Sequence, residues 1–204
     1  MAIRSDALFG VFVCNEELIE VVRYTDSFKD PEYKIWYAML VRCYQEKSLL
    51  KNKSYVGCSV SESFKDYRKF KKWCNKQIGF RSRDEKGKVF HLDKDILVKG
   101  NKVYSEDTCC FVPHEINSAI TSTGVKENEL PVGVSKRKDR DTYSATITKH
   151  GKVQHLGSFP TANEACEVYI TERNEYILQL ANKWKGKIST ETYFKLISNF
   201  STFN

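Results

Sequence analysis

Apolar and polar residues recur along the chain at spacings that change from segment to segment. Residues 7–14 (ALFGVFVC) are an apolar run too short for a membrane span or a signal peptide, and they predict a strand. Asp30-Pro31 is typical of a helix start, with Asp at the N-cap and proline at the first helical position. Apolar residues at helical spacing then predict one buried helix face: Tyr33, Trp36, Tyr37, Leu40, Cys43 and Tyr44.

A second helix is predicted from Ser61 to just before Gly79. Residues at helical spacing on one face should point inward, and they are Phe64, Tyr67, Phe70 and Cys74. The other face carries basic residues, which are Lys65, Arg68, Lys69, Lys72 and Lys76. This helix is therefore expected to pack with one side and to present positive charge with the other.

The segment from 89 to 120 predicts the order strand, turn, strand, helix. Residues 87–98 interleave apolar side chains with charged ones, and Gly100-Asn101 is a turn signal. Residues 109–120 (CCFVPHEINSAI) predict a short strand, a break at Pro113, and one or two turns of helix.

A polar linker at 123–130 predicts a division of the chain into domains 1–122 and 131–204. The second domain contains three short strand candidates, at 132–137, 143–149 and 153–156. A capping-box pattern from Thr161 to Glu164 opens a long helix. Its inward face should consist of Ala165, Tyr169, Tyr176, Ile177, Leu180 and Trp184, and a last helix follows at about 190–199. The predicted fold class is α+β, with a three-stranded antiparallel sheet packed on a helix.

The middle strand of this sheet separates apolar from polar residues. Tyr143, Ala145 and Ile147 alternate with Ser144, Thr146 and Thr148, and a three-stranded sheet must bury one side to be stable. The apolar set is expected to face the long helix, which leaves the hydroxyl face exposed. Basic residues flank that face, and they are Lys136, Arg137, Lys138, Arg140, Lys149 and Lys152. Such a face can lie in the major groove of DNA.

Charge and cysteine content agree with an intracellular partner of this kind. The net charge of +7 is concentrated in two segments. Residues 61–102 contain 13 lysines and arginines against 6 acidic residues, and residues 131–155 contain 6 against 2. Two basic patches suit a polyanion that is contacted at two places. The seven cysteines include no CxxC pair, so no zinc site is expected and the thiols should be reduced and mostly buried.

The run from Pro131 to Ile170 resembles the Apetala/ethylene-response-factor DNA-binding domain. The shared features are a Gly-Val strand at 133–134, inward Ala145 and Ile147, the turn Leu-Gly-Ser-Phe at 156–159, and Thr161 to Ala165 opening the helix. The resemblance implies that outward residues of the three strands contact DNA. These are Ser135, Arg137, Ser144, Thr146, Thr148 and His155. Plant members place arginines and tryptophans at several of these positions, so their target sequence is not carried over.

Most of residues 8–120 resembles phage HNH-type endonucleases, a group that includes homing enzymes carrying an Apetala-like module. The motifs are Trp36-Tyr-Ala-Met-Leu, Tyr55-x-Gly-Cys and the run LDKDILVKGNKVYSEDTCCFVPHEIN from Leu92 to Asn117. The resemblance implies a ββα-metal domain with flanking helices. It also implies a divalent metal, usually Mg²⁺ with Mn²⁺ as a substitute, which stabilises the departing 3′ oxygen.

The same resemblance implies roles for five residues. Asp93 and Asn117 take the metal-ligand positions, and Asn101, at the turn between the two strands, is a candidate catalytic residue. Lys94 stands where the family has the general-base histidine, and it could act as a base only if its pKa fell by several units. His91, two residues before Asp93, is the other candidate, and the sequence leaves this choice open.

The leading hypothesis is a metal-dependent endonuclease that hydrolyses phosphodiesters of double-stranded DNA. Arg68, Lys69 and Lys72 on the basic helix would hold a long site together with the sheet. The alternative is a catalytically inactive DNA-binding regulator on a degenerate nuclease scaffold. Neither a membrane nor a small-molecule cofactor is expected, and the phage resemblance implies action in the cytoplasm of a bacterial host.

Overall fold

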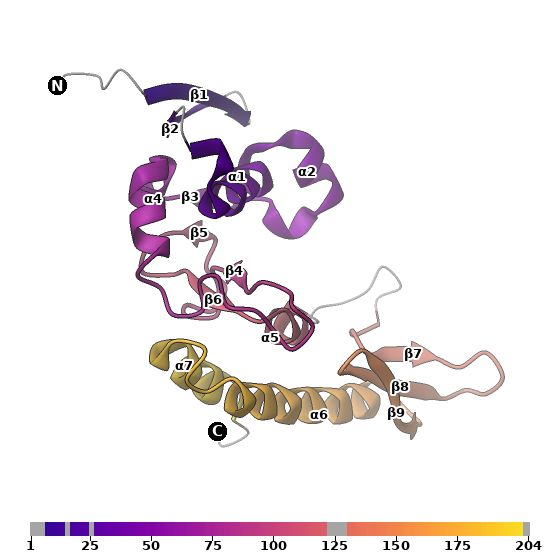
Figure 1. Cartoon of the computed structure of the whole chain (residues 1–204). Helices are drawn as coiled ribbons and strands as arrows, with labels where there is room; N and C mark the ends of the chain where they lie inside the picture. Colours follow the sequence, from indigo (N-terminus) through magenta and orange to yellow (C-terminus); the bar gives the residue numbers. More distant parts are fainter. Residues whose placement is uncertain (1–6, 15–16, 25–26, 122–129, 202–204) are drawn as a thin grey trace. The chain divides into compact units, whose positions relative to one another are not determined.

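A computed structural model describes residues 7–14, 17–24, 27–121 and 130–201 (Figure 1). The protein is a mixed α+β chain with a three-stranded antiparallel sheet near its C-terminus. The chain divides into two compact units. The first contains Met1–Arg81 and Leu92–Phe111, and the second contains Ser82–His91 and Val112–Asn204. This division differs from the predicted one, because segments 82–91 and 112–121 belong with the C-terminal part.

The first unit begins with a β-hairpin, in which β1 (Ala7–Cys14) pairs with β2 (Glu17–Tyr24). Helical segments η1 (Ser27–Lys29), α1 (Pro31–Tyr44), α2 (Glu46–Lys51) and η2 (Lys53–Tyr55) follow. The short strand β3 (Ser59–Val60) pairs in parallel with β5 (Val103–Tyr104). Helices α3 (Glu62–Lys65) and α4 (Tyr67–Cys74) follow β3 along the chain. A separate two-stranded sheet is formed by β4 (His91–Asp93) and β6 (Cys110–Val112).

An aromatic core holds α1 against the α3–α4 segment. Trp36, Phe64 and Phe70 are fully buried, and the indole N–H of Trp36 donates to the carbonyl of Phe64 at 2.6 Å. The predicted inward face of α1 is confirmed except at Tyr37, which is exposed. The predicted inward face of the second helix is confirmed at all four residues, Phe64, Tyr67, Phe70 and Cys74.

The basic segment 61–78 forms two helices instead of the single one predicted. Asp66 has an extended backbone, and its carboxylate accepts from the N–H groups of Arg68 and Lys69. An Asp side chain that caps a new N-terminus in this way competes with continuation of the preceding helix. The local hydrogen bonds of Asp66 therefore divide the segment.

The strand predicted at 87–98 is likewise shorter than expected. Only His91–Asp93 is extended, because the Asp93 carboxylate accepts from the N–H groups of Asp95 and Ile96 at 2.9 Å each and turns the chain. Upstream, the Asp84 carboxylate accepts from the N–H groups of Lys86 and Lys88. A tight turn around Gly87 therefore replaces the first part of the predicted strand.

The second unit carries the three-stranded sheet on a long helix. Strand β8 (Tyr143–Lys149) lies between β7 (Val134–Lys136) and β9 (Lys152–Phe159). These strands lie near the N-terminal end of α6 (Ala162–Lys183), which also contacts α5 (His114–Thr121) and α7 (Thr190–Phe200) (Figure 1). Among the helices that the structure describes, none is both long and apolar enough to cross a membrane.

The predicted core of this unit is confirmed. Val134, Ala145 and Ala165 are completely buried together, and Thr161 caps α6 by accepting from the N–H of Glu164. All six predicted inward residues of α6 are buried. Gly133 has a φ of +84°, and a Cβ there would lie 2.2 Å from the ring of Tyr169. Only glycine can therefore let the sheet approach α6 this closely.

Candidate nucleic-acid interface

The outer face of the sheet is a grid of small polar side chains. Because directly opposed residues of paired strands share a face, the strand register places Ser135, Ser144 and Ser158 in one row. Thr146 pairs with His155 in the second row, and Thr148 pairs with Val153 in the third. A bulge between Ala145 and Thr146 separates the first two rows.

Most of this grid is open to solvent. Ser135, Thr148 and His155 are exposed, whereas Ser144 and Thr146 are half-buried. The hydroxyl of Ser144 lies 3.1 Å from Nδ1 of His155, which leaves the other ring nitrogen free of this contact. Hydroxyl and imidazole groups of this kind can donate to or accept from base edges.

Val153 and Ser158 also belong to this grid, and the sequence interpretation missed both. Val153 is 72% exposed, which is unusual for a large apolar side chain on a polar face. An apolar group at such a position can contact the methyl group of thymine. The register about the Gly151 turn places Val153 opposite Thr148, whereas Ser158 lies beyond the predicted strand and reaches this face only because of the bulge.

The cations beside the grid are exposed and paired with two aspartates of the same hairpin. Lys136 lies 3.0 Å from Asp141, and Arg137 donates to both oxygens of Asp139 at 3.0 and 3.1 Å. Arg140 contacts the same Asp139 at 3.6 Å, while Lys138 and Lys152 are exposed. These pairs lie in solvent, where water and salt screen them, so a phosphate can compete with the aspartates for the cations, least easily for Arg137 with its two hydrogen bonds.

Lys149 does not belong to this surface, contrary to the sequence interpretation. It is only 9% exposed and forms an ion pair with Glu172 on α6. Strict alternation in β8 explains the difference, because Lys149 has the same parity as Ala145 and Ile147 and points toward the helix.

The basic surface of the first unit is carried by α4. Lys69 and Lys72 are exposed on this helix. Arg68 is half-buried, and its guanidinium lies 3.7 Å from the centre of the Tyr24 ring. Two of the three predicted residues on this helix are thus exposed to solvent.

The residues expected to act in a nuclease form an internally paired cluster. The ammonium of Lys94 lies 3.0 Å from Asp95 and donates to the carbonyl of Asn101 at 3.2 Å. The Asn101 amide donates to the carbonyls of Lys94 and Val103 at 2.6 and 2.7 Å. Lys94 and Asn101 therefore hold the loop closed, and both side chains are engaged in that role.

The pKa values in this cluster do not favour Lys94 as a general base. Burial alone would lower the pKa of Lys94, but the hydrogen bond and negative charge of Asp95 outweigh it and raise the pKa. Burial, followed by the charge of Asp95, raises the pKa of Asp93 to about 6. A base at neutral pH would need a lysine with a lowered pKa, so the raised pKa of Lys94 does not favour that role.

The remaining nuclease candidates lie in the second unit. His91 stacks on His114, with ring centres 5.1 Å apart and planes at 26°. Asn117 is half-buried on α5, and its side-chain amide makes no hydrogen bond to a described residue. Within the described ranges, no group of three or more His, Cys, Asp or Glu side chains could hold a metal ion.

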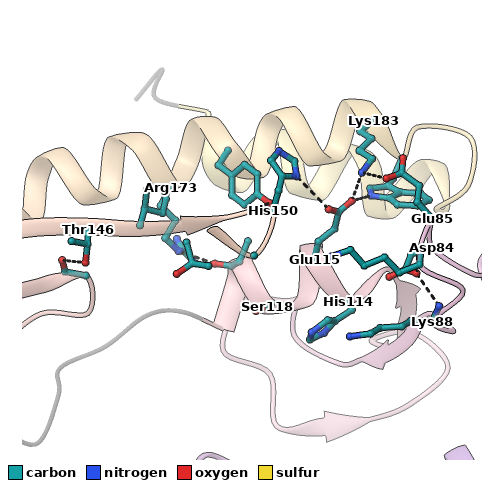
Figure 2. Close-up of a pocket in the computed structure, with 18 of the residues that line it drawn as sticks. Asp84, Glu85, Lys88, His114, Glu115, Ser118, Thr146, His150, Arg173 and Lys183 are labelled. Atoms are coloured by element: carbon teal, nitrogen blue, oxygen red, sulfur yellow. Dashed lines mark hydrogen bonds and ion pairs between the residues drawn. The ribbon is translucent and has the colours of Figure 1, made fainter. Parts of the chain in front are cut away.

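A pocket of about 500 Å³ lies within the second unit (Figure 2). Its walls come from the turn at 84–88, α5, α6 and the edge of β8. Glu115 is central to the wall and accepts from Lys183 at 2.9 Å and from the indole of Trp184. Arg173 donates to the carbonyls of Ala119 and Ile120 at 2.9 and 2.7 Å, which ties the end of α5 to α6.

The chain matches no protein-family model, and no curated protein or solved structure is detectably similar to it.

Proposed function

We propose that this protein binds double-stranded DNA through the outer face of the sheet formed by β7, β8 and β9. The observation that carries the proposal is the exposed grid of hydroxyl and imidazole side chains beside four cations of one hairpin. The major groove is wide enough to admit β structure. Action in the cytoplasm of a bacterial host is part of the proposal and rests on the phage resemblance.

The hairpin cations and the side chains of the grid would contact different parts of the DNA. Arg137, Lys138 and their neighbours would contact phosphates, which contributes affinity without sequence information. Thr148, His155 and Val153 would contact base edges and contribute sequence preference.

Double neutralisation of the hairpin tests this proposal. A plot of log affinity against log salt has a negative slope, and Arg137→Ala with Lys138→Ala should make it shallower by about 2. Each lost phosphate contact removes about 0.9 from its magnitude. The measurement is fluorescence anisotropy of a labelled mixed-sequence duplex over a salt series. Lys185→Ala with Lys195→Ala is the matched control, since both lysines are exposed in the same unit and away from the sheet face. An unchanged slope in the hairpin variant would exclude this face as the DNA surface.

Cleavage of DNA is the second candidate function. It is favoured by the order β4, β6, α5 along the chain, with Asp93 at the end of β4. The surroundings of Asp93 do not fit a magnesium ion. One of its oxygens already accepts two backbone N–H groups, and the buried ammonium of the adjacent Lys94 repels a second cation.

We therefore expect the protein to bind DNA without cleaving it. The test is incubation of the full chain with genomic DNA, with and without Mg²⁺ or Mn²⁺, followed by electrophoresis. Metal-dependent fragments that disappear in Asp93→Ala and in Asn117→Ala would establish an endonuclease instead.

A further inference from the structure

The pocket of the second unit is continuous with the outer face of the sheet. Thr146 and Thr148 belong both to the outer grid and to the pocket wall. The reason is that β7 pairs only with Tyr143–Ala145, so the second half of β8 has an open edge. The pocket lies along this edge, and α5 forms its opposite wall (Figure 2).

The open edge presents a backbone donor to the pocket. The N–H of Thr146 donates to the carbonyl of Gly133 at 2.8 Å, on the β7 side of the strand. Because N–H groups alternate sides along a strand, the N–H of Thr148 points to the same edge, beyond the last β7 pair. Backbone N–H groups and hydroxyls are common phosphate ligands in protein–DNA complexes.

The carboxylates in the pocket wall are already engaged. Asp84 accepts from two backbone N–H groups, at 2.9 and 2.8 Å, and Glu85 lies 3.1 Å from Lys183. Lys183 and Trp184 both donate to Glu115. Each of these carboxylates therefore already accepts hydrogen bonds within the second unit, and Glu85 and Glu115 share the ammonium of Lys183.

Two further cations line the pocket, and the hydrogen bonds from their backbone N–H groups, together with their charges, lower the pKa of Asp84. Lys86 and Lys88 are exposed on the turn that Asp84 caps, and neither ammonium is in a salt bridge with any described residue. The turn therefore holds two lysines at the pocket whose lining also includes the open edge of β8. Exposed ammonium groups of this kind suit an anionic ligand.

We propose that this pocket takes the sugar-phosphate backbone of one DNA strand, the strand that borders the groove occupied by the sheet. A sheet lying in the major groove has a phosphate backbone along each side, and the edge of β8 is one of those sides. Lys86 and Lys88 contact the phosphates from the turn, and the N–H of Thr148 contacts them from the sheet. This inference rests on the proposed DNA-binding function and extends the contact surface to residues 84–88 and α5.

The experiment compares three double variants of the full chain on the same labelled duplex. Lys86→Gln with Lys88→Gln should reduce the magnitude of the slope of log affinity against log salt by about 2. It should also weaken binding roughly 10-fold at moderate salt. The sheet-face variant Arg137→Ala with Lys138→Ala should show a loss of similar size. Lys185→Gln with Lys195→Gln, which removes the same charge outside the pocket, should leave the slope unchanged.

A second readout locates the strand directly. The photoreactive residue p-benzoylphenylalanine in place of Ser118, an exposed pocket residue on α5, should crosslink to the duplex under ultraviolet light. The same residue in place of Ser198, exposed on α7, should not.

The outcomes separate this inference from the proposed function. If only the sheet-face variant has a shallower slope of log affinity against log salt, and position 118 gives no crosslink, the pocket inference is overturned and the sheet proposal stands. Absence of duplex binding by the unmodified protein would overturn both. A third outcome is that dAMP raises the unfolding temperature while Lys86→Gln with Lys88→Gln leaves the salt dependence of duplex binding unchanged. That result would assign the pocket to a free nucleotide and overturn the strand inference.

Discussion

In the hairpin between β7 and β8, the basic side chains lie in water and share two exposed aspartates. In the loop after β4, the Lys94 side chain is 8% exposed, and its ammonium is bound by Asp95 and by the carbonyl of Asn101. Both regions are rich in charge, and the sequence assigned a DNA-related role to each. The difference lies in what the charge already contacts. Exposed pairs can exchange partners, whereas the buried ammonium of Lys94 is bonded within its own loop and is shielded from a ligand.

The largest effect should follow from removing the buried cation. Lys94→Met removes the ion pair with Asp95 and the hydrogen bond to the carbonyl of Asn101, so the free energy of unfolding should fall by about 2 kcal/mol. Urea denaturation followed by circular dichroism measures this change. Lys99→Met, at an exposed lysine of the same loop, is the control and should change stability by less than about 0.5 kcal/mol. Equal effects in the two variants would show that Lys94 is not a structural cation.

A smaller effect should appear in the pH dependence of stability. The pKa of Asp93 is about 6 in the folded protein, against 3.8 for an ordinary Asp carboxyl, because the side chain is buried. Below pH of about 4 the carboxyl is protonated in both states, and its contribution to stability is complete. As the pH rises toward about 6, the unfolded chain releases this proton first, so the folded state loses stability.

Asp93→Asn removes this titration and provides the comparison. The urea midpoint of the unmodified protein, minus that of Asp93→Asn, should fall as the pH rises through this window and then level off. A difference that rises with pH would mean that the carboxylate is held in its charged form, as a bound cation would do.

The smallest effect on stability should follow from changing the exposed cations. Arg137→Ala with Lys138→Ala removes exposed contacts only, so the free energy of unfolding should change by less than about 1 kcal/mol. The same urea experiment measures it. If this variant lost as much stability as Lys94→Met, the hairpin cations would be structural, and the contrast between the two regions would disappear.

Much of the fold was predictable because its signals are local. The helix start at Asp30-Pro31 and the cap at Thr161 depend on residues a few positions apart. The inward direction of Ala145 and Ile147 depends on strict alternation within one strand. The same alternation already places Lys149 inward, and the sequence interpretation overlooked it because a lysine was assumed to be exposed.

Other features depended on competition between local and distant contacts. Asp66 divides a segment whose helical periodicity is otherwise continuous, and Asp93 ends a strand whose apolar pattern continues to Val98. In both cases a carboxylate bonds backbone N–H groups two or three residues ahead. Periodicity alone cannot weigh that bond against continuation of the element.

The sequence by itself determined an α+β chain with a C-terminal sheet on a helix, because side-chain alternation and capping bonds are fixed by nearest neighbours. It also determined that the two basic segments would be present. Only the tertiary structure decided which of their charges are available. Lys149 is bound by Glu172, 23 residues away on α6, whereas Lys86 and Lys88 at the pocket are in no salt bridge with a described residue. The physical reason is that an ion pair depends on which side chains the fold brings within a few ångströms, and no spacing along the chain specifies that.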